Sequence, residues 1–456
     1  MRISHVIHTF PPFSRAGSEN YCEALARRQA RRHTVSVFHR VADPQRPEYE
    51  VGEERRGPLE VVRVNRIFAD VTSFRDTYEA APLARRFGDY LDRFRPDVVH
   101  FHHVTCLSTR CVHEARERGI AVVYTLHDFW LFCPRGQLLR RDLSLCDRHT
   151  DADCVRCVAY QLPVEGGHER VTKLYERAER LRRWPLPKGV HRRLASLPFA
   201  GETAAVGEIR ARTEHVLDMC SRVDRFIAPT RFLRDRYVEF GVPGEKILVS
   251  DYGFDLEPWR TMPEAEPEPS GRLRAAYLGT WIPSKGVDVL LEAFRGLDPE
   301  RAVLDVHGYA LPFDGVEGYE ESLRALAQGA PHVRFRERYE PEDTPRLLAA
   351  ADVLVVPSIW YENSPLTVHE AFLAGVPVIV SGHGGMAELV RGGGGLTFRP
   401  GDAASLRRVL QRLIDDRGLL ARLRRELPAV KSLEADDAGI EALYAEIGAP
   451  AGASHG

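Results

Sequence analysis

The stretch 351–388 constrains the fold of this 456-residue chain more than any other part of it. It opens with ADVLVV, an uninterrupted β-branched run that is typical of a strand buried on both faces of a parallel sheet. Ser364 and Pro365 then predict a helix start, because a serine hydroxyl can cap free amides and proline suits the first helical position. Gly375 should end this helix, and the run VPVIV should form the next strand. The stretch therefore predicts one strand–helix–strand unit.

This unit is suited to bind an anion next to hydroxyl groups. Its helix start should face the carboxyl end of its strand, where open α/β sheets bind ligands and free N–H groups attract phosphate. Glu362 lies just before the helix start, Glu370 lies inside the helix, and the glycines of 382–385 form a turn that lets backbone approach a ligand. Because carboxylates repel phosphate, they would accept hydrogen bonds from hydroxyls on either side of it, as in a diphosphate with a sugar at each end. Spacing alone is equally compatible with two solvated glutamates on a buried helix.

Glu362 and Glu370 form the pattern E-x7-E, and AGVPVI and GG-x-x-E follow it. This combination resembles the donor site of retaining glycosyltransferase family 4, and ENSP at its start resembles one branch of that family. The resemblance implies an α/β fold of two doubly wound Rossmann-like domains facing a central cleft (GT-B). It also implies a retaining, hexosyl-type transfer from a UDP- or GDP-linked nucleotide-sugar to a hydroxyl of a glycan, lipid-linked or small-molecule acceptor. No cofactor and no catalytic metal would be required.

The same resemblance assigns the site residues, with catalysis by charge stabilisation from His127, Lys285 and Glu362. Lys285 lies between strand and helix in a glycine turn, where its ammonium can neutralise a diphosphate. His127 ends the run AVVYTLH and would lie on the acceptor side, close to the reacting carbon. The donor-binding residues implied are Gly17, Thr280, Lys285, Gly308, Tyr339, Glu362, Asn363, Ser364, Pro365, Leu366, Thr367 and Glu370.

Two positions depart from the pattern of that family. Thr280 stands where arginine is common, and Ala16 stands where a second glycine usually precedes Gly17. Losing the arginine should weaken stabilisation of the leaving group, unless another cation such as Arg15 or Arg338 reaches the site.

Length and composition set the domain organisation. A chain of this length with 44% hydrophobic residues can bury two or three cores, and we assign two. The expected parts are an N-terminal acceptor-binding domain over 1–255 and a Pro- and Glu-rich linker over 256–271. A nucleotide-sugar-binding domain over 272–428 and a C-terminal helix over 429–447 that crosses back to the first domain complete the chain. An insertion over about 133–200 interrupts the first domain.

Four cysteines, Cys133, Cys146, Cys154 and Cys157, fall inside this insertion and end in C-x-x-C. Four thiolates could hold a structural zinc ion tetrahedrally, yet twelve residues separate the first pair. A zinc site and scattered free thiols both remain open, with an iron–sulfur or redox role as a third alternative.

Charge and hydropathy indicate a cytoplasmic protein without a nucleic-acid partner. The formal net charge is −2, no apolar run reaches membrane-spanning length, and the N-terminal residues lack the pattern of a signal peptide. Residues 171–181 have helical periodicity with a basic face. They could lie on an anionic membrane at its inner face or pack against their own domain.

Three other functions stay open at this stage. A nucleotide-sugar epimerase would share the fold, and a nucleotide-sugar-binding protein without activity would fit the missing arginine. A zinc-dependent nucleic-acid or scaffold protein would use the cysteines, but the chain lacks the basic stripe that nucleic-acid binding requires.

Overall fold

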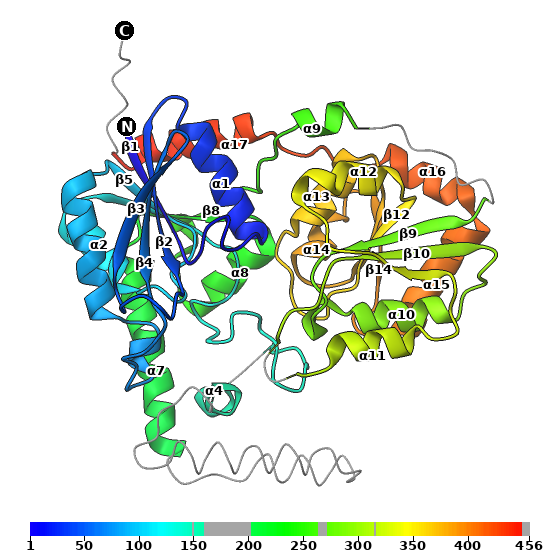
Figure 1. Cartoon of the computed structure of the whole chain (residues 1–456), viewed down its shortest axis with the longest axis horizontal. Helices are drawn as coiled ribbons and strands as arrows, with labels where there is room; N and C mark the ends of the chain where they lie inside the picture. Colours follow the sequence, from blue (N-terminus) through cyan, green and yellow to red (C-terminus); the bar gives the residue numbers. More distant parts are fainter. Residues whose placement is uncertain (148–149, 159–201, 263–270, 314–315, 449–456) are drawn as a thin grey trace.

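The computed structural model describes residues 1–147, 150–158, 202–262, 271–313 and 316–448. Within these residues the chain forms two α/β domains side by side, each built on its own sheet (Figure 1). The predicted class of two doubly wound domains is therefore confirmed.

The first domain contains an eight-stranded sheet in the order β3-β4-β2-β1-β5-β6-β7-β8. Every neighbouring pair is parallel except β3 and β4. The strands are β1 (Arg2–Ile7), β2 (Thr34–Val41), β3 (Val51–Arg56), β4 (Leu59–Asn65), β5 (Val98–Phe101), β6 (Ala121–Thr125), β7 (Arg225–Ala228) and β8 (Ile247–Val249). The helices are α1 (Gly17–Gln29), α2 (Ala81–Phe94), α3 (Arg110–Glu117), α4 (Asp151–Val158), α7 (Glu202–Ser221) and α8 (Arg231–Phe240).

The second domain contains a parallel six-stranded sheet in the order β11-β10-β9-β12-β13-β14. Its strands are β9 (Leu273–Leu278), β10 (Ala302–His307), β11 (Val333–Phe335), β12 (Val353–Val356), β13 (Val378–Ser381) and β14 (Gly395–Phe398). The helices of this half are α9 (Glu257–Arg260), α10 (Val287–Arg295), α11 (Tyr319–Leu326), α12 (Thr344–Ala349), α13 (Leu366–Leu373), α14 (Gly384–Leu389), α15 (Ala403–Asp415) and α16 (Arg417–Arg425).

Both sheets are buried on two faces, because successive strand residues belong to different apolar clusters. Val98 and Val99 of β5 are both fully buried, and each packs in a separate cluster. Tyr277 and Leu278 of β9 divide in the same way in the second domain. The uninterrupted apolar runs in the sequence correspond to this two-sided burial.

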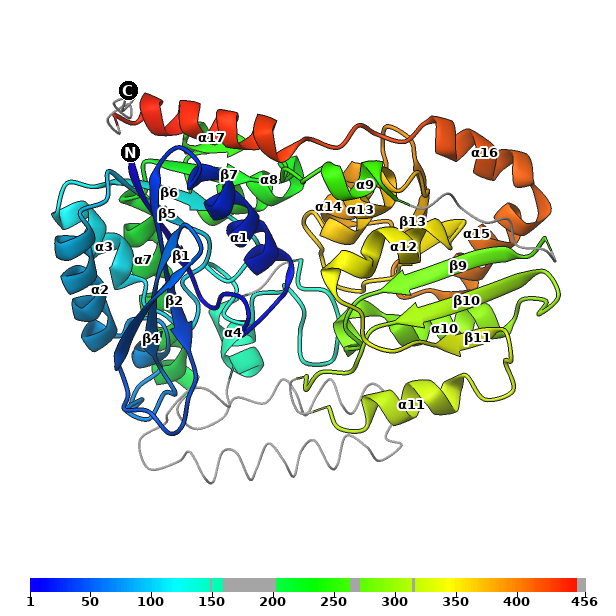
Figure 2. The ribbon, with the colours of Figure 1, turned by 45° about the horizontal axis from the view of Figure 1, so that its top comes forward.

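The last helix, α17 (Leu433–Glu446), lies over the first domain (Figure 2). Tyr21 of α1 donates a hydrogen bond to its Asp436 over 2.8 Å. Its Tyr444 hydroxyl is 2.7 Å from His100 Nδ1 at the end of β5. The chain thus crosses from the second domain back to the first before it ends.

The strand–helix–strand unit forms as β12, α13 and β13, but its cap was predicted wrongly. The helix begins one residue later than expected, at Leu366, and Pro365 occupies the N-cap position without a side-chain cap bond. The Ser364 hydroxyl instead donates to Asp251 of the first domain over 2.7 Å. Gly375, with a φ of 73°, follows the last helical turn as predicted.

Several expectations fall partly or wholly outside the described residues. The predicted basic helix over 171–181 lies there, as does most of the insertion over about 133–200. The expected linker over 256–271 includes the short helix α9 and the undescribed residues 263–270. Among the helices that the structure describes, none combines the length and apolar character needed to cross a membrane.

Candidate active site

Lys285 and Glu362 form an ion pair where β9 and β12 end. Lys285 Nζ lies 2.6 Å from Glu362 Oε1, and the same oxygen accepts hydrogen bonds from Ser358 Oγ and Trp360 Nε1, each over 2.8 Å. Three donors therefore converge on one carboxylate oxygen and fix the orientation of the carboxylate. Ser358 and Trp360 were not singled out in the sequence, because a serine and a tryptophan in a loop carry no spacing signal.

The two charges of this pair differ in exposure. The Glu362 side chain is 7% exposed, whereas the Lys285 side chain is 29% exposed. An ammonium has three N–H donors, and the bond to Glu362 uses one of them. Lys285 can therefore offer further donors and its charge to an anion.

Glycines bring the surrounding loops close to this pair. Gly286 has a φ of 67°, and a Cβ there would lie 2.3 Å from the Pro357 carbonyl oxygen. A Cβ on Gly385 would lie 1.5 Å from the Asn363 carbonyl oxygen, and the Gly385 N–H donates to the Glu362 carbonyl over 2.9 Å. The glycine turn after β13 is thus required by the Glu362 loop, whereas the sequence suggested that it approaches a ligand.

Glu370 and Tyr339 lie close enough to each other for the Glu370 carboxylate to affect the Tyr339 hydroxyl. Burial raises the pKa of Glu370 to about 7. Burial also raises the pKa of Tyr339, with the Glu370 carboxylate as the next cause. Burial also raises the pKa of Tyr277, and the nearby Tyr339 and Glu362 raise it further. Tyr277 therefore belongs to this group, although it lies within a strand and gave no sequence signal.

Gly308 and Thr280 occupy the turns that follow β10 and β9. Gly308 has a φ of 138°, and a Cβ there would lie only 1.8 Å from the Gly279 carbonyl oxygen. The Thr280 carbonyl accepts a hydrogen bond from the Tyr277 hydroxyl over 2.7 Å. Gly308 is therefore needed to let two turns pack together, a structural role that is sufficient to explain it.

The ENSP motif uses its side chains to hold the first domain. Asn363 Nδ2 donates to the His127 carbonyl over 2.8 Å, and Ser364 bonds to Asp251. Asn363 Oδ1 is buried and has no hydrogen-bond partner among the described residues. The sequence placed both side chains on the donor, whereas the structure engages Asn363 Nδ2 and the Ser364 hydroxyl with the first domain.

The glutamate of the GG-x-x-E motif also forms hydrogen bonds between the two domains. The Glu388 carboxylate accepts hydrogen bonds from the backbone N–H groups of Arg231 and Phe232, each over 3.0 Å. These amides begin α8, so Glu388 caps a helix of the other domain. Sequence reasoning recognised this glutamate as part of a motif but could not show its partner.

A chain of hydrogen-bonded histidines leads to His127 through the first domain. His5 Nε2 lies 2.9 Å from Gln29 Oε1, and His5 Nδ1 lies 3.0 Å from His102 Nε2. His102 Nδ1 lies 3.2 Å from His127 Nε2, and the Tyr252 hydroxyl lies 2.8 Å from His127 Nδ1. We call these five residues the histidine chain. Both ring nitrogens of the fully buried His102 have partners, so it is a satisfied core histidine.

The amide oxygen of Gln29 fixes the proton positions along the histidine chain. An amide oxygen only accepts, so His5 Nε2 must donate and His5 Nδ1 must accept when the ring is neutral. The same alternation makes His102 and His127 donate from Nε2, and Tyr252 donates to His127 Nδ1. Burial lowers the pKa of His5 to about 4 and that of His127 to about 3, so the chain is neutral at pH 7.

The neutral histidine chain does not suit a metal ion. His5, His100 and His102 are the described residues whose ligand atoms lie within 4.8 Å of one another. His100 already contacts the Tyr444 hydroxyl and Thr125 Oγ1, each at 2.7 Å, and both nitrogens of the other two rings are engaged in the chain. Metal binding would need a ring nitrogen with a free lone pair, so we assign no metal here.

Further polar residues meet at the start of α1. Glu19 is 2% exposed and accepts hydrogen bonds from Ser14 Oγ at 3.0 Å and Ser18 Oγ at 2.7 Å. His8 Nε2 lies 3.6 Å from the same carboxylate, while His8 Nδ1 is buried without a partner among the described residues. A Cβ on Gly17 would make an ordinary 3.5 Å contact with Leu366, so protein packing alone does not require that glycine. His8 was missed, because it belongs to no spaced pattern, and Glu19, which follows Gly17 and Ser18 in the family's glycine loop, was assigned no role.

The two cations named as replacements for the missing arginine are both exposed. Arg338 lies 3.7 Å from Glu340, with its guanidinium 4.6 Å from the centre of the Tyr309 ring. Arg15 lies in the loop before α1. Among the described residues, neither forms an ion pair or hydrogen bond with Lys285 or Glu362.

Comparison with known proteins adds two family matches. Residues 260–428 match the profile of glycosyl transferases group 1, and residues 15–162 match that of glycosyltransferase family 4. The first match spans the lysine–glutamate pair and the second spans His127. Together they cover most of both domains.

Among curated proteins, the O-antigen chain mannosyltransferase B of Escherichia coli is 34% identical over 147 residues, or 31% of this chain and 37% of that protein. The D-inositol 3-phosphate glycosyltransferase of Streptomyces coelicolor is 31% identical over 227 residues, or 44% of this chain and 50% of that protein. The matches thus span half or less of the length of these relatives.

Solved structures share the fold over nearly the whole chain. Sucrose-phosphate synthase of Thermosynechococcus elongatus superposes with a TM-score of 0.66 at 18% identity, over 98% of each chain. HepE of Anabaena, solved with UDP-glucose, superposes with a TM-score of 0.62 at 17% identity, also over 98% of each chain. At this level of identity the likeness establishes the fold alone.

Proposed function

The chain belongs to glycosyltransferase family 4, and from this premise we propose that it transfers a hexosyl-type sugar from a UDP- or GDP-linked donor to an acceptor hydroxyl. The transfer retains the anomeric configuration, and the acceptor is a glycan, a lipid-linked sugar or a small molecule. The observation that carries the proposal is the Lys285–Glu362 pair, whose Nζ and Oε1 atoms lie 2.6 Å apart.

The donor diphosphate binds to Lys285 and to the start of α13. The backbone N–H groups of Leu366 and Thr367 are in the first turn of an eight-residue helix, where amides lack partners inside the helix. Glu370 accepts hydrogen bonds from ribose hydroxyls, and Glu362 accepts them from the transferred sugar. Because the bond to Glu362 uses one N–H donor of Lys285, the diphosphate binds the remaining donors.

Buried polar atoms without partners support a ligand at this position. Asn363 Oδ1 and Ser284 Oγ belong to residues that are 3% and 0% exposed, and neither atom has a partner among the described residues. Buried polar groups are normally hydrogen-bonded, so a small shift of these loops on donor binding would expose both atoms to the hydroxyls and phosphate oxygens of a nucleotide-sugar.

Catalysis rests on stabilising the charge of the leaving group. The acceptor hydroxyl attacks the anomeric carbon on the face that the diphosphate leaves, and the departing diphosphate takes the hydroxyl proton. Lys285 and the α13 amides stabilise the negative charge that develops on the diphosphate. His127 lies beside the reacting carbon as a neutral group. The reaction needs no metal, so a zinc ion at the four cysteines would be structural.

A second candidate function is nucleotide-sugar binding without transfer. Thr280, in place of the common arginine, favours it, because the site then has one cation fewer for the leaving diphosphate. Donor binding with neither transfer nor hydrolysis would identify this case. The cytoplasmic location and the membrane-surface alternative remain proposals from the sequence.

The first test is the thermal stability of the purified chain with a panel of nucleotides and nucleotide-sugars. A ligand at ~100 times its dissociation constant adds ~2.7 kcal/mol to the free energy of unfolding. We expect a selective rise in Tm with one donor, which Glu370→Ala abolishes and Glu292→Ala, an exposed control on α10, preserves. Product analysis by NMR should then show the donor's anomeric configuration in the product. No shift with any nucleotide would contradict the proposal.

A further inference from the structure

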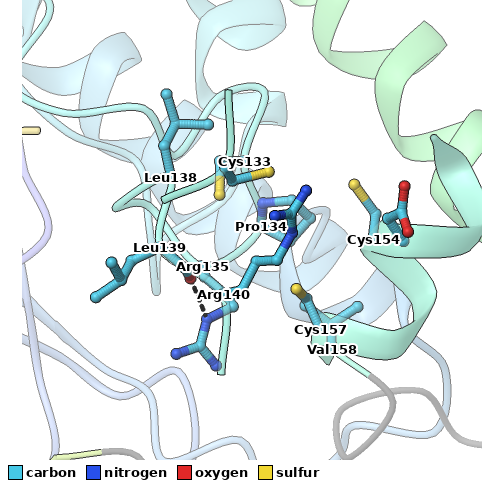
Figure 3. Close-up of a pocket in the computed structure, with 11 residues that line it drawn as sticks. Cys133, Pro134, Arg135, Leu138, Leu139, Arg140, Cys154, Cys157 and Val158 are labelled. Carbon is cyan, nitrogen blue, oxygen red and sulfur yellow. Dashed lines mark hydrogen bonds between the residues drawn. The ribbon is translucent and has the colours of Figure 1, made fainter. Parts of the chain in front are cut away.

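Four cysteines that are far apart in the sequence line one cavity in the first domain. Its walls include Cys133, Cys146, Cys154 and Cys157 together with Arg135 and Arg140. Cys154 and Cys157 approach it from α4, and Cys133 approaches it from the facing loop (Figure 3). All eight cysteines of the chain lie within the described residues and all are free thiols.

The loop that carries the first pair folds back on itself. The Gly136 N–H donates to the Cys133 carbonyl over 2.7 Å, which closes a tight turn directly after Cys133. Leu139 and Leu145 then form an antiparallel bridge, and the Cys146 N–H donates to the Leu138 carbonyl over 2.8 Å. This hairpin returns Cys146 to the cavity, so the twelve intervening residues do not separate the two thiols in space.

The second pair lies on a single turn of α4. Cys154 and Cys157 are three residues apart in this helix, so their side chains share one face. C-x2-C is a common half of a zinc site. The structure thus presents two half-sites, one from a hairpin and one from a helix, on opposite sides of one cavity.

We propose that Cys133, Cys146, Cys154 and Cys157 bind one structural zinc ion. Binding converts four thiols into thiolates and releases four protons, which leaves a net charge of −2 on the site. Arg135 and Arg140 in the cavity wall offset this charge, and Asp153, which also lines the cavity, adds one negative charge to it. The cavity volume of about 20 Å³ suits a single ion, because one water-sized particle needs roughly 10–15 Å³ on this scale.

Zinc binding must draw the two half-sites together. No three of the four sulfurs lie within 4.8 Å of one another, although all four are described. Four sulfurs at about 2.3 Å from a tetrahedral zinc ion lie about 3.8 Å apart. Rotation of the cysteine side chains into the cavity would close this gap and clamp α4 against the hairpin.

Zinc binding would restrict the motion of the loop that joins His127 to the second domain. The Tyr361 hydroxyl, from the loop of Glu362, donates to the Asp147 carboxylate directly after Cys146. Arg236 of α8 donates to the Asp147 carbonyl over 3.2 Å. A zinc ion would hold this contact in place, whereas Lys285, Glu370 and the nucleotide part of the donor site lie in the other domain.

The test is the metal content of the purified full chain, measured by elemental analysis. We expect one equivalent of zinc per chain in the wild type, a loss of most of that zinc in Cys154→Ser, and full retention in Cys106→Ser. Cys106 is a half-buried cysteine outside the cavity, so this control makes the same chemical change.

Cobalt substitution tests the ligand set without a variant. After removal of the metal with a chelator, one equivalent of Co²⁺ added to the wild type should give thiolate-to-cobalt charge-transfer bands and the intense visible bands of a tetrahedral tetrathiolate. These bands should disappear when one equivalent of Zn²⁺ is added.

Three results would overturn the proposal: iron with acid-labile sulfide in place of zinc, zinc retained in Cys154→Ser, or a metal-free wild type that shows no cobalt bands. Nucleotide-induced shifts in Tm report the other domain. The zinc site and the proposed function can therefore fail independently of each other.

Discussion

The two domains contribute different side chains to the proposed reaction, charged groups in the second domain and neutral histidines in the first. The second domain contributes charge: Lys285 and Glu362 lie 2.6 Å apart, and Glu370 is a carboxyl whose pKa burial raises to about 7. The first domain contributes the histidine chain, in which burial lowers the pKa of His127 to about 3. Asn363 joins the two, because it follows Glu362 directly and holds the His127 carbonyl.

This difference matches where charge develops in a sugar transfer. In the proposed reaction the leaving diphosphate is anionic, and we expect Lys285 to bind it. The incoming hydroxyl is neutral, and we expect the neutral imidazole of His127 to contact it without competing for the diphosphate. If the two sides act independently, a change on one side should leave the other unaffected.

The largest expected effect is acid destabilisation through the first domain. Burial lowers the pKa values of His5, His100, His102 and His127, so each ring stays neutral in the folded state. Below pH ~6.5 the unfolded state binds more protons, and stability falls as pH falls towards the folded pKa values. At pH 5 each such histidine costs up to about 2 kcal/mol. Urea denaturation at pH 7.5, 6 and 5 should show a steep loss, and an unchanged midpoint would contradict neutral burial.

The next effect concerns the cation of the second domain. We expect Lys285→Ala to lower kcat/KM by ~10²–10³, because it removes a donor aimed at the charge on the leaving group. Arg295→Ala, which removes an exposed cation at the end of α10, should leave the rate unchanged. Steady-state kinetics with the identified donor measure both variants. Full activity in Lys285→Ala would remove Lys285 from the mechanism.

Glu370→Gln should separate stability from function. The folded pKa of Glu370 lies near 7, above its ordinary value of 4.5, so the folded state pays a cost that grows as pH rises from ~4.5 to ~7. The glutamine variant should be more stable than the wild type by about 1–3 kcal/mol at pH 8, with little gain at pH 4.5, while donor binding weakens. Urea denaturation at both pH values, with Glu292→Gln as control, checks this. An equal effect at both pH values would show that ionisation of Glu370 is not responsible.

The smallest expected effect comes from the end of the histidine chain. Tyr252→Phe removes the hydroxyl that donates to His127 Nδ1 and leaves that nitrogen without its donor. We expect kcat to fall several-fold, which corresponds to about 1 kcal/mol in activation free energy, with unchanged nucleotide affinity. Tyr90→Phe, a buried tyrosine bonded to Ser4 and Ser36, should lower stability without changing kcat. Weaker nucleotide binding in Tyr252→Phe would show that the two sides are not separable.

Site residues that lie near one another in the sequence were the easiest to predict. Glu362 and Glu370 lie in one loop and helix, so their spacing alone predicts which element carries them. Lys285 comes from another element, but its glycine turn marks the end of a strand, and parallel strands end at the same edge of a sheet. Short-range patterns of this kind are predictive because the geometry of a strand, turn or helix fixes the spacing of the residues within it.

The remaining features depend on contacts between distant residues. Gln29, His5, His102 and Tyr252 come from four separate segments, and no spacing predicts that their side chains meet. The capping role expected for Ser364 failed because a partner in the other domain took its hydroxyl. The wide spacing between the first two cysteines, which argued against a zinc site, is closed by a hairpin that the sequence did not reveal.

The central claim is that Lys285 recognises the donor's diphosphate, and nucleotide binding by calorimetry tests it most directly. UDP and GDP should be compared with UMP and GMP on the wild type and on Lys285→Ala. We expect the preferred diphosphate to bind at least ~10-fold more tightly than its monophosphate, since each tenfold step corresponds to ~1.4 kcal/mol. This advantage should disappear in Lys285→Ala. Equal affinity for the two nucleotides in the wild type, or an advantage that survives in the variant, would contradict the claim.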